Sequence, residues 1–222
     1  MSKLVKQPTA PFNPFYGCAI MFMVVAMGVG GVYWIYHVGK TMDEEIGKFT
    51  VDVPVKPVAV KPDAAGVAAQ KGRVETFAND AKAGKAATLA LTIPELNALV
   101  ELAPDSGYGN FAEILAFKTV APGGPVTAEV CLPMNKNPLV GGKRYAIGLA
   151  TFQVEIVNET GPDLKLTALE VPGKEVIPEF VQLFSSYSLL APYHKLEALA
   201  PVMKAIKSVK INAAGVELST QP

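Results

Sequence analysis

The sequence predicts an α+β fold, in which an N-terminal transmembrane helix is followed by one domain of curved antiparallel sheet packed on helices. Three observations lead to this expectation. An uncharged apolar run lies near the N-terminus, several later segments alternate between apolar and polar residues, and two segments near the C-terminus carry apolar residues at helical spacing. The mean hydropathy of +0.29 is high for a soluble chain, and one membrane span accounts for much of it.

The apolar run predicts the first element. No charged residue occurs between Gln7 and Tyr36, and the strongly apolar part covers residues 15–36. At about 1.5 Å per residue, such a helix reaches roughly 33 Å, which is enough to cross a hydrocarbon core of about 30 Å. We therefore expect a transmembrane helix at residues 15–38, preceded by a cytoplasmic tail at residues 1–14.

The charges that flank the run predict its orientation. Lys3 and Lys6 precede it, whereas Asp43, Glu44 and Glu45 follow it. Positive residues favour the cytoplasmic side of a membrane, so we expect a cytoplasmic N-terminus and an extracytoplasmic main domain. We favour a bacterial source, which places the span in the inner (cell) membrane and the domain in the periplasm or outside the cell.

A cleaved signal peptide is the main alternative to an anchor. Its apolar region has only about 7–15 residues and ends in small residues. The best cleavage site here is Ala26–Gly28, and cutting there leaves an apolar stump on the mature chain. A lipoprotein needs its apolar run before the cysteine, whereas Cys18 has the run after it. We expect an uncleaved anchor.

Small residues gather inside the expected span. Ala26 and Gly30 have small-xxx-small spacing, and Gly28 and Gly31 lie beside them. Such residues let a second helix approach closely, so we expect contact with another transmembrane subunit or with a second copy of the chain. The competing interpretation is that glycine is common in spans generally.

A proline-rich segment follows the span. Pro54, Pro57 and Pro62 are separated by valine and lysine, which favours an extended, polyproline-like chain, with a short edge strand as the alternative. We expect a linker at residues 39–66 and an extracytoplasmic α+β domain at residues 67–222.

Turn and cap signals place the elements of that domain. Thr92–Glu95 is a capping box that starts a short helix after a strand, and Pro122–Pro125 joins two strands into a hairpin. In the strand after residue 143 the apolar alternation changes phase, which predicts a bulge near Ala150–Thr151. A helix with a wide apolar face follows residue 177, and Pro201 predicts a kink or two short helices.

Motifs of catalytic, nucleotide-binding and metal-binding sites are missing from the sequence. His194 is the only histidine of the outer domain, and Cys131 is out of phase with its apolar neighbours, so we expect structural roles for both. Asn97 interrupts an apolar stripe, where it binds a ligand or, as we expect, makes local hydrogen bonds. We predict a protein that is not an enzyme and has no cofactor and no metal.

The charge distribution limits the partners. The formal net charge is zero, which gives no basic footprint for nucleic acid. Lys204, Lys207 and Lys210 give the last helix a mildly basic rim. These lysines are either an ordinary solvated face or a contact with anionic lipid headgroups.

Several segments between residues 87 and 220 resemble a known group of proteins. They are "LTIPELNALV", "CLPMNKNPLVGGKRYAIGLATFQVEIVN", "PGKEVIPEF" and the closing "KSVKINAAGVELST". The pattern is similar to small single-pass bacterial envelope proteins of uncharacterised function, which have a Leu-Asn-x-Leu helix and a long strand pair. The resemblance implies a strongly bent antiparallel sheet wrapped on helices, distantly similar to tubular lipid-binding domains.

Three hypotheses for function follow. The first is a membrane-anchored, non-catalytic binding module, with lipid as one ligand, and it predicts an apolar cavity of about 300 Å³ or more. The second is an accessory or scaffold subunit of a larger membrane complex, with a solid domain core and partners held by the span. The third is a hydrolase or transferase with a cleft that gathers His194 with carboxylates and Ser185, Ser186 or Cys131.

Overall fold

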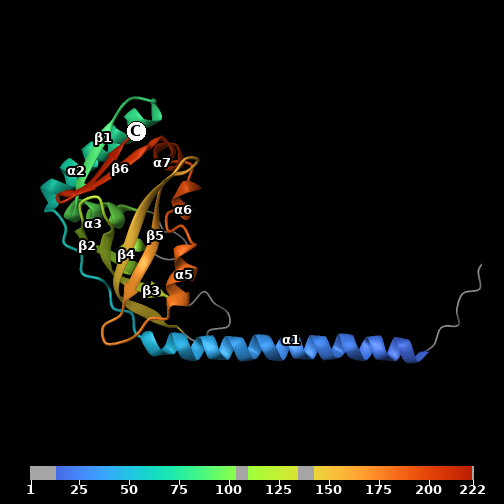
Figure 1. The fold of residues 1–222 in the computed structure, drawn as a ribbon. Coiled ribbons are helices and arrows are strands. Elements are labelled where there is room, and N and C mark those ends of the chain that lie inside the picture. Colours follow the sequence, from blue (N-terminus) through green and yellow to red (C-terminus); the bar gives the residue numbers. More distant parts are fainter. Residues whose placement is uncertain (1–13, 104–109, 135–142, 222) are drawn as a thin grey trace, which may run out of the picture.

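The computed structural model describes residues 14–103, 110–134 and 143–221, so the expected tail lies almost wholly outside it. The α+β class is confirmed, but the domain contains two antiparallel sheets where the sequence predicts one (Figure 1). In chain order the elements are α1 (Pro14–Phe49), α2 (Ala64–Lys82), β1 (Thr88–Thr92), α3 (Ile93–Leu102), α4 (Phe111–Ile114), β2 (Leu115–Val120), β3 (Val126–Pro133), β4 (Tyr145–Val157), β5 (Gly161–Glu170), α5 (Pro178–Ser185), α6 (Ala191–His194), α7 (Ala200–Ala205), β6 (Ser208–Asn212) and β7 (Gly215–Ser219).

The helix α1 is longer than the sequence predicts and ends inside the domain. Residues 39–49, expected in the extended linker, form its last turns. Lys40 and Glu44 pair at i, i+4 on an exposed face, whereas Ile46 and Phe49 are buried in the core. The expected linker begins too early because this segment has no proline, and the side chains that bury it come from distant parts of the chain.

Residues 50–63 of the expected linker are extended, as predicted, but they are attached to the domain, and the last three linker residues begin α2. Val51 and Tyr145 form a β-bridge with N···O distances of 2.9 and 2.8 Å. Further along, the Lys118 ammonium donates to the carbonyl oxygen of Val58 at 3.0 Å. The linker is therefore a strap on the domain surface and not a free spacer.

Asn97 of α3 holds the strap to the larger sheet. Its amide nitrogen donates to the carbonyl oxygens of Val60 and Phe117 at 3.1 and 3.0 Å, and its side-chain oxygen accepts from the Phe117 N–H at 2.7 Å. The residue is buried, and these bonds use its hydrogen-bonding capacity. The expectation of local hydrogen bonds is wrong, because the partners of Asn97 are backbone groups 20 and 37 positions away in the chain.

The larger sheet has the order β2-β3-β4-β5, and every neighbouring pair is antiparallel. The predicted hairpin at Pro122–Pro125 is confirmed, because it joins β2 to β3. The main core lies against the inner face of this sheet. It brings together Phe49 from α1, Phe152 from β4 and Phe180 from α5.

An irregularity near the predicted bulge is confirmed, because the pairing of β4 with β5 shifts between Thr151 and Phe152, but the predicted change of phase within β4 is wrong. Ala146, Ala150 and Phe152 all face the core, and β4 pairs with β3 without a shift. The irregularity lies in β5, where Thr167 is the extra residue opposite the step from Thr151 to Phe152. Near the start of β4 the inner positions are alanine or glycine and the outer positions are larger apolar residues. The apolar alternation in the sequence therefore follows the outer face there.

The smaller sheet has the order β1-β7-β6 and closes the other end of the domain. The first strand pairs with the last, from Thr88 opposite Ser219 to Thr92 opposite Gly215. The pairing of β6 with β7 forms a C-terminal hairpin. Together with α2, this sheet encloses a second core of Phe77, Leu89, Leu91 and Ile206.

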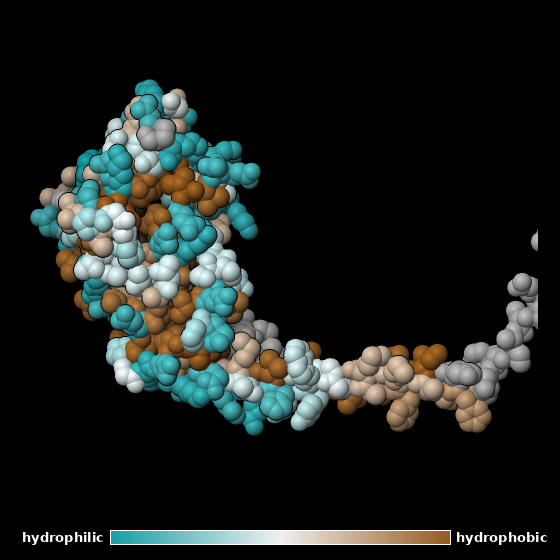
Figure 2. Space-filling model, in the orientation of Figure 1, coloured by the Kyte–Doolittle hydropathy of each residue, from teal (hydrophilic) through white to brown (hydrophobic). Residues whose placement is uncertain are grey.

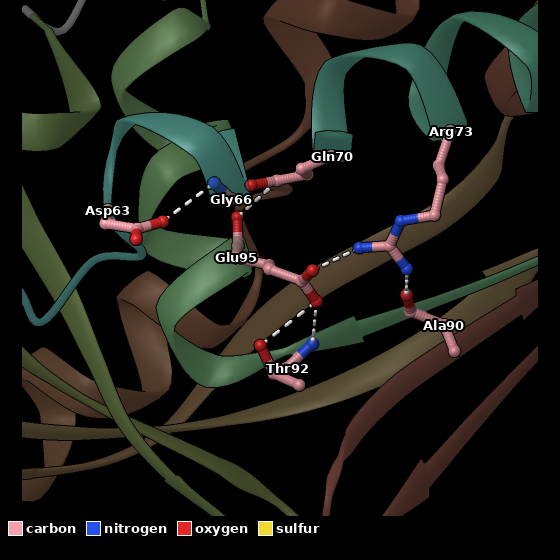
Figure 3. Close-up of polar contacts among 7 residues, drawn as sticks. All are labelled: Asp63, Gly66, Gln70, Arg73, Ala90, Thr92 and Glu95. Carbon is pink, nitrogen blue, oxygen red and sulfur yellow. Dashed lines mark hydrogen bonds and ion pairs between the residues drawn. The ribbon is translucent and has the colours of Figure 1, made fainter. Parts of the chain in front are cut away.

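A polar network joins α2, β1 and α3 beside the second core (Figure 3). The Glu95 carboxylate accepts from the Thr92 N–H at 2.8 Å and the Thr92 hydroxyl at 3.0 Å, which confirms the capping box. Arg73 pairs with Glu95 and donates to the carbonyl oxygen of Ala90 at 3.1 Å. Gln70 donates to the carbonyl oxygen of Glu95 at 2.7 Å.

The C-terminal helices line one side of the domain. Figure 1 shows α5, α6 and α7 on the side toward which the N-terminal part of α1 extends, while α2 and the strap lie on the other side. The two short helices predicted around Pro201 are confirmed, because α6 and α7 are separate and Pro201 occupies the first turn of α7.

Candidate functional site: an apolar pocket at the end of α1

An apolar pocket of about 940 Å³ lies between the last turns of α1, the helix α5 and the inner face of the larger sheet. Ligand sites commonly have volumes of about 300–1,000 Å³, so this pocket is large enough for a lipid-sized molecule. Met42 and Ile46 of α1 form one wall, Leu132 and Phe152 of the sheet form another, and Phe184 of α5 faces them.

The helix α5 supplies much of the wall because its sequence fixes both its start and its apolar face. Pro178 lies in the first turn, where a missing N–H breaks no helical hydrogen bond. The Phe180 ring lies 5.1 Å from the Phe49 ring and 4.5 Å from the Phe184 ring, measured between centroids. This aromatic layer joins α5 to the end of α1, and Leu183 lines the pocket beside it.

Some lining residues are exposed to solvent, and we call this set the pocket mouth. It consists of Thr41 and Met42 on α1 and of Glu179, Leu183 and Tyr187 on or just after α5. The exposed fractions of Met42, Leu183 and Tyr187 are 42%, 48% and 54%. The pocket therefore opens through an apolar rim that lies next to α1.

Polar groups are few in the wall, and two of them are already paired. Glu45 binds Lys48 at 2.5 Å, and the Ser188 hydroxyl donates to the buried carboxylate of Asp163 at 2.6 Å. The lining residues that the structure describes include no Lys, Arg or His. The pocket therefore suits the apolar part of a ligand, and it offers no cation from these residues to a ligand carboxylate.

The groups that a hydrolase would use make other contacts. A ring nitrogen of His194 lies 2.9 Å from the carbonyl oxygen of Pro162, and the hydroxyls of Ser185 and Ser186 donate to backbone carbonyls of their own helix. Within the described residues, no group of three or more His, Cys, Asp or Glu side chains is placed to hold a metal ion.

Cys131 lies in β3 beneath the strap. Desolvation by burial raises the pKa of its thiol, and a hydrogen bond with the backbone of Val55 opposes this effect only in part. A thiol with a raised pKa is a poor nucleophile. This placement matches the structural role predicted from its position out of phase with Val130.

The residues that the sequence singles out lie away from the pocket. Ala26, Gly28, Gly30 and Gly31 are exposed in the middle of α1, and a Cβ added at any of the three glycines would have no neighbour within 4 Å. The lysines of the expected basic rim are all exposed, but only Lys204 lies on the last helix, α7. Lys207 follows that helix, and Lys210 lies on β6. Their predicted contacts with a helix and with headgroups stay predictions.

Most of the pocket cannot be located from local patterns in the sequence. The apolar spacing of α5 is visible in the sequence, but it predicts only a core-facing helix. Met42 and Ile46 lie in a segment assigned to the linker, and nothing local in the sequence indicates that this segment meets α5. A continuation of apolar residues at helical spacing past Tyr36 is the signal that could have located this wall.

The part of the chain that the structure describes has one helix long and apolar enough to cross a membrane, at Cys18–Phe49. Its most apolar window is not buried by any other part of the described chain, and Figure 2 shows it in tan and brown. No family model, curated protein or solved structure matches this chain. The resemblance to single-pass envelope proteins therefore stays a prediction.

Proposed function

We propose that this chain is a single-pass protein of the bacterial inner membrane whose extracytoplasmic domain binds an apolar ligand, such as a lipid acyl chain, without chemical conversion. The observation that carries the proposal is the pocket of about 940 Å³, which has apolar walls and an apolar mouth. Its volume exceeds the value of about 300 Å³ that the binding-module hypothesis requires.

The form of α1 supports an uncleaved anchor. Large apolar side chains such as Phe22, Val29 and Trp34 have 80%, 66% and 67% of their surface exposed, which an aqueous environment disfavours. Cleavage at Ala26–Gly28 would leave Val29 to Tyr36 as an exposed apolar helix on the mature chain. A bilayer removes this surface from water, and the acidic residues after the span favour an extracytoplasmic domain.

The position of the pocket supports a membrane lipid as the ligand. Tyr36 is the last residue of the strongly apolar run, and Met42 of the pocket mouth follows it in the same helix. Six residues of α-helix correspond to about 9 Å. A lipid that leaves the bilayer beside α1 would thus meet the pocket after a short path, with little apolar surface in water.

Native mass spectrometry of the detergent-extracted full-length chain tests the ligand. Leu132 is a partly buried residue of the pocket wall, so Leu132→Trp places an indole where the ligand would lie. Leu102→Trp is the matched control, because Leu102 is 61% exposed on α3 and is absent from the lining. We expect a lipid-mass adduct on the wild type and on Leu102→Trp, with at least a tenfold lower occupancy on Leu132→Trp.

Two results would contradict this proposal. The first is a wild-type chain without an adduct after extraction and after incubation with phospholipid. The second is an adduct whose occupancy is the same in all three proteins, because such a lipid is held elsewhere, for example on α1. Circular dichroism of the two variants shows whether each retains the wild-type fold.

An accessory subunit of a membrane complex is the second candidate. The bare surface at Gly28, Gly30 and Gly31 favours it, because a partner helix could approach the backbone closely there. The same spectra test this function. A stoichiometric partner that dissociates from a Gly28→Leu variant would support it, whether that partner is a different subunit or a second copy.

A further inference from the structure

The domain has a fixed orientation relative to α1 because the helix enters it without a flexible joint. Ile46 and Phe49 in its last turn are buried with exposed fractions of 6% and 1%. Asp43 pairs with Arg144, which precedes β4, at 3.6 Å, and the Lys174 ammonium donates to the carbonyl oxygen of Thr50 at 3.1 Å. The direction of α1 therefore determines which side of the domain faces a membrane that α1 spans.

That side carries α5 and the pocket mouth. The N-terminal part of α1 extends toward the side lined by α5, α6 and α7 (Figure 1). Met42, Leu183 and Tyr187 lie on it as exposed apolar residues around one opening. Contact of these side chains with water is unfavourable, and a bilayer surface removes them from water.

We propose that the pocket mouth rests against the outer leaflet of the bilayer that holds α1, so that the pocket opens into lipid and not into water. The inference rests on the membrane anchoring proposed above, and it names the surface through which the ligand enters. Tyr187 suits this position, because a tyrosine places its apolar ring toward the acyl chains and its hydroxyl toward the headgroups.

The chemistry of the mouth favours a bilayer over a protein partner as the occupant. Apart from Glu179, its described residues are apolar or carry only a hydroxyl, and they surround a cavity instead of a flat patch. The covalent link through α1 also keeps lipid within about 9 Å of Met42, a distance that corresponds to six helical residues.

Quenching of fluorescent labels by spin-labelled lipid tests this inference on the full chain in nanodiscs. A Cys18→Ser background receives a single new cysteine, at Leu183→Cys or at Tyr187→Cys, and each carries an environment-sensitive dye. Val58→Cys is the control, because Val58 is a 73% exposed apolar residue of the strap on the other side of the domain. Cys131 can stay, since it is buried.

We expect lipids with a nitroxide on the headgroup or the upper acyl chain to quench the labels at residues 183 and 187 at least threefold more than the label at residue 58. Their emission should also shift to shorter wavelength. Equal quenching at all three positions, or stronger quenching at residue 58, would overturn the inference. The two mouth positions protect against a local effect of one variant, because each is half exposed and tolerates substitution.

A label on the native Cys18 separates this inference from the proposed anchor. Cys18 is exposed near the start of the apolar run. If its label is quenched while those at residues 183 and 187 are not, α1 spans the bilayer and only the membrane contact of the mouth is wrong. If the Cys18 label is not quenched, the anchor fails and the inference fails with it.

Discussion

The two ends of the domain are built in different ways from similar residues. Near α1, aromatic and aliphatic side chains of α1, α5 and the larger sheet surround an open pocket. At the other end, α2 and the smaller sheet close on Phe77, Leu91 and Ile206, and a polar network joins the elements around them (Figure 3). The second core shows that side chains of this protein can close on one another. We therefore attribute the open space beside α1 to a ligand and not to poor packing.

Truncation of buried leucines should show the largest difference between the two ends. Leu91 is 2% exposed in the second core, so Leu91→Ala should lower the free energy of unfolding by about 2–5 kcal/mol, because it leaves a new cavity. Leu132→Ala removes a side chain that already borders open space, and we expect a loss of about 1 kcal/mol. Urea denaturation of the full chain in detergent measures both losses.

Equal losses for the two leucine variants would break the comparison, since they would mean that the pocket wall is packed as tightly as the second core. A lipid bound during the measurement would raise the apparent stability of the wild type. The urea denaturation should therefore be repeated on protein from which the lipid has been removed.

Asn97 should have the next largest effect, because it joins the strap from α1 to the larger sheet. Asn97→Ala leaves the buried N–H and carbonyl groups of Phe117 without this partner, and we expect a loss of about 1–3 kcal/mol. The released strap should also be cut faster by elastase, which cleaves after small apolar residues. Asn79→Ala, on the exposed surface of α2, is the control and should change the stability by less than about 0.5 kcal/mol.

A loss of stability in Asn97→Ala without faster cleavage would show that the other contacts of the strap are sufficient to hold it on the domain. The bridge of Val51 with Tyr145 and the bond from Lys118 to Val58 would then hold it. In that case the domain would keep its orientation on α1 even in the Asn97→Ala variant.

The smallest effect concerns pH and the network of the second end. Burial acts to raise the pKa of Glu95, but the hydrogen bonds from Thr92 and the charge of Arg73 outweigh it, so the pKa lies below its ordinary value. A lowered pKa in the folded state stabilises the fold above the unfolded pKa of about 4.3, and this stabilisation disappears as the pH falls through the folded pKa.

Glu95→Gln removes this dependence. Between pH 6 and pH 3 the wild type should lose about 1 kcal/mol more stability than Glu95→Gln, as measured by thermal or urea unfolding at each pH. Glu75→Gln is the control, because the Glu75 side chain is 63% exposed. A wild type and a Glu95→Gln variant with parallel pH profiles would show that the network contributes nothing to the stability of this end.

Local signals in the sequence predict much of the second end and of the C-terminal half. The capping box at Thr92–Glu95, the turn at Pro122–Pro125 and the short helices around Pro201 depend on neighbours in the chain, and each is confirmed. The span-length apolar helix is also confirmed as a helix, whereas its insertion into a membrane stays a proposal.

The features that the sequence does not predict depend on contacts between distant residues or on positions occupied by small residues. The segment at residues 39–49 becomes a helix buried against Phe180, which lies more than a hundred positions further along. The inner face of β4 starts with alanine and glycine, so its alternation is weak; a Cβ at Gly148 would lie 2.1 Å from the carbonyl oxygen of Glu170. The pocket combines both problems, since its walls meet only in the folded chain.

The pairing of β1 with β7 has a consequence for how the chain is made. Thr88 lies opposite Ser219, so the partner of β1 is a strand that is synthesised more than a hundred residues later. Until then β1 has an unpaired edge, and closing a loop of this length is slow. Folding of the end remote from α1 must therefore wait until β7 has been made, which leaves that edge open to a chaperone in the meantime.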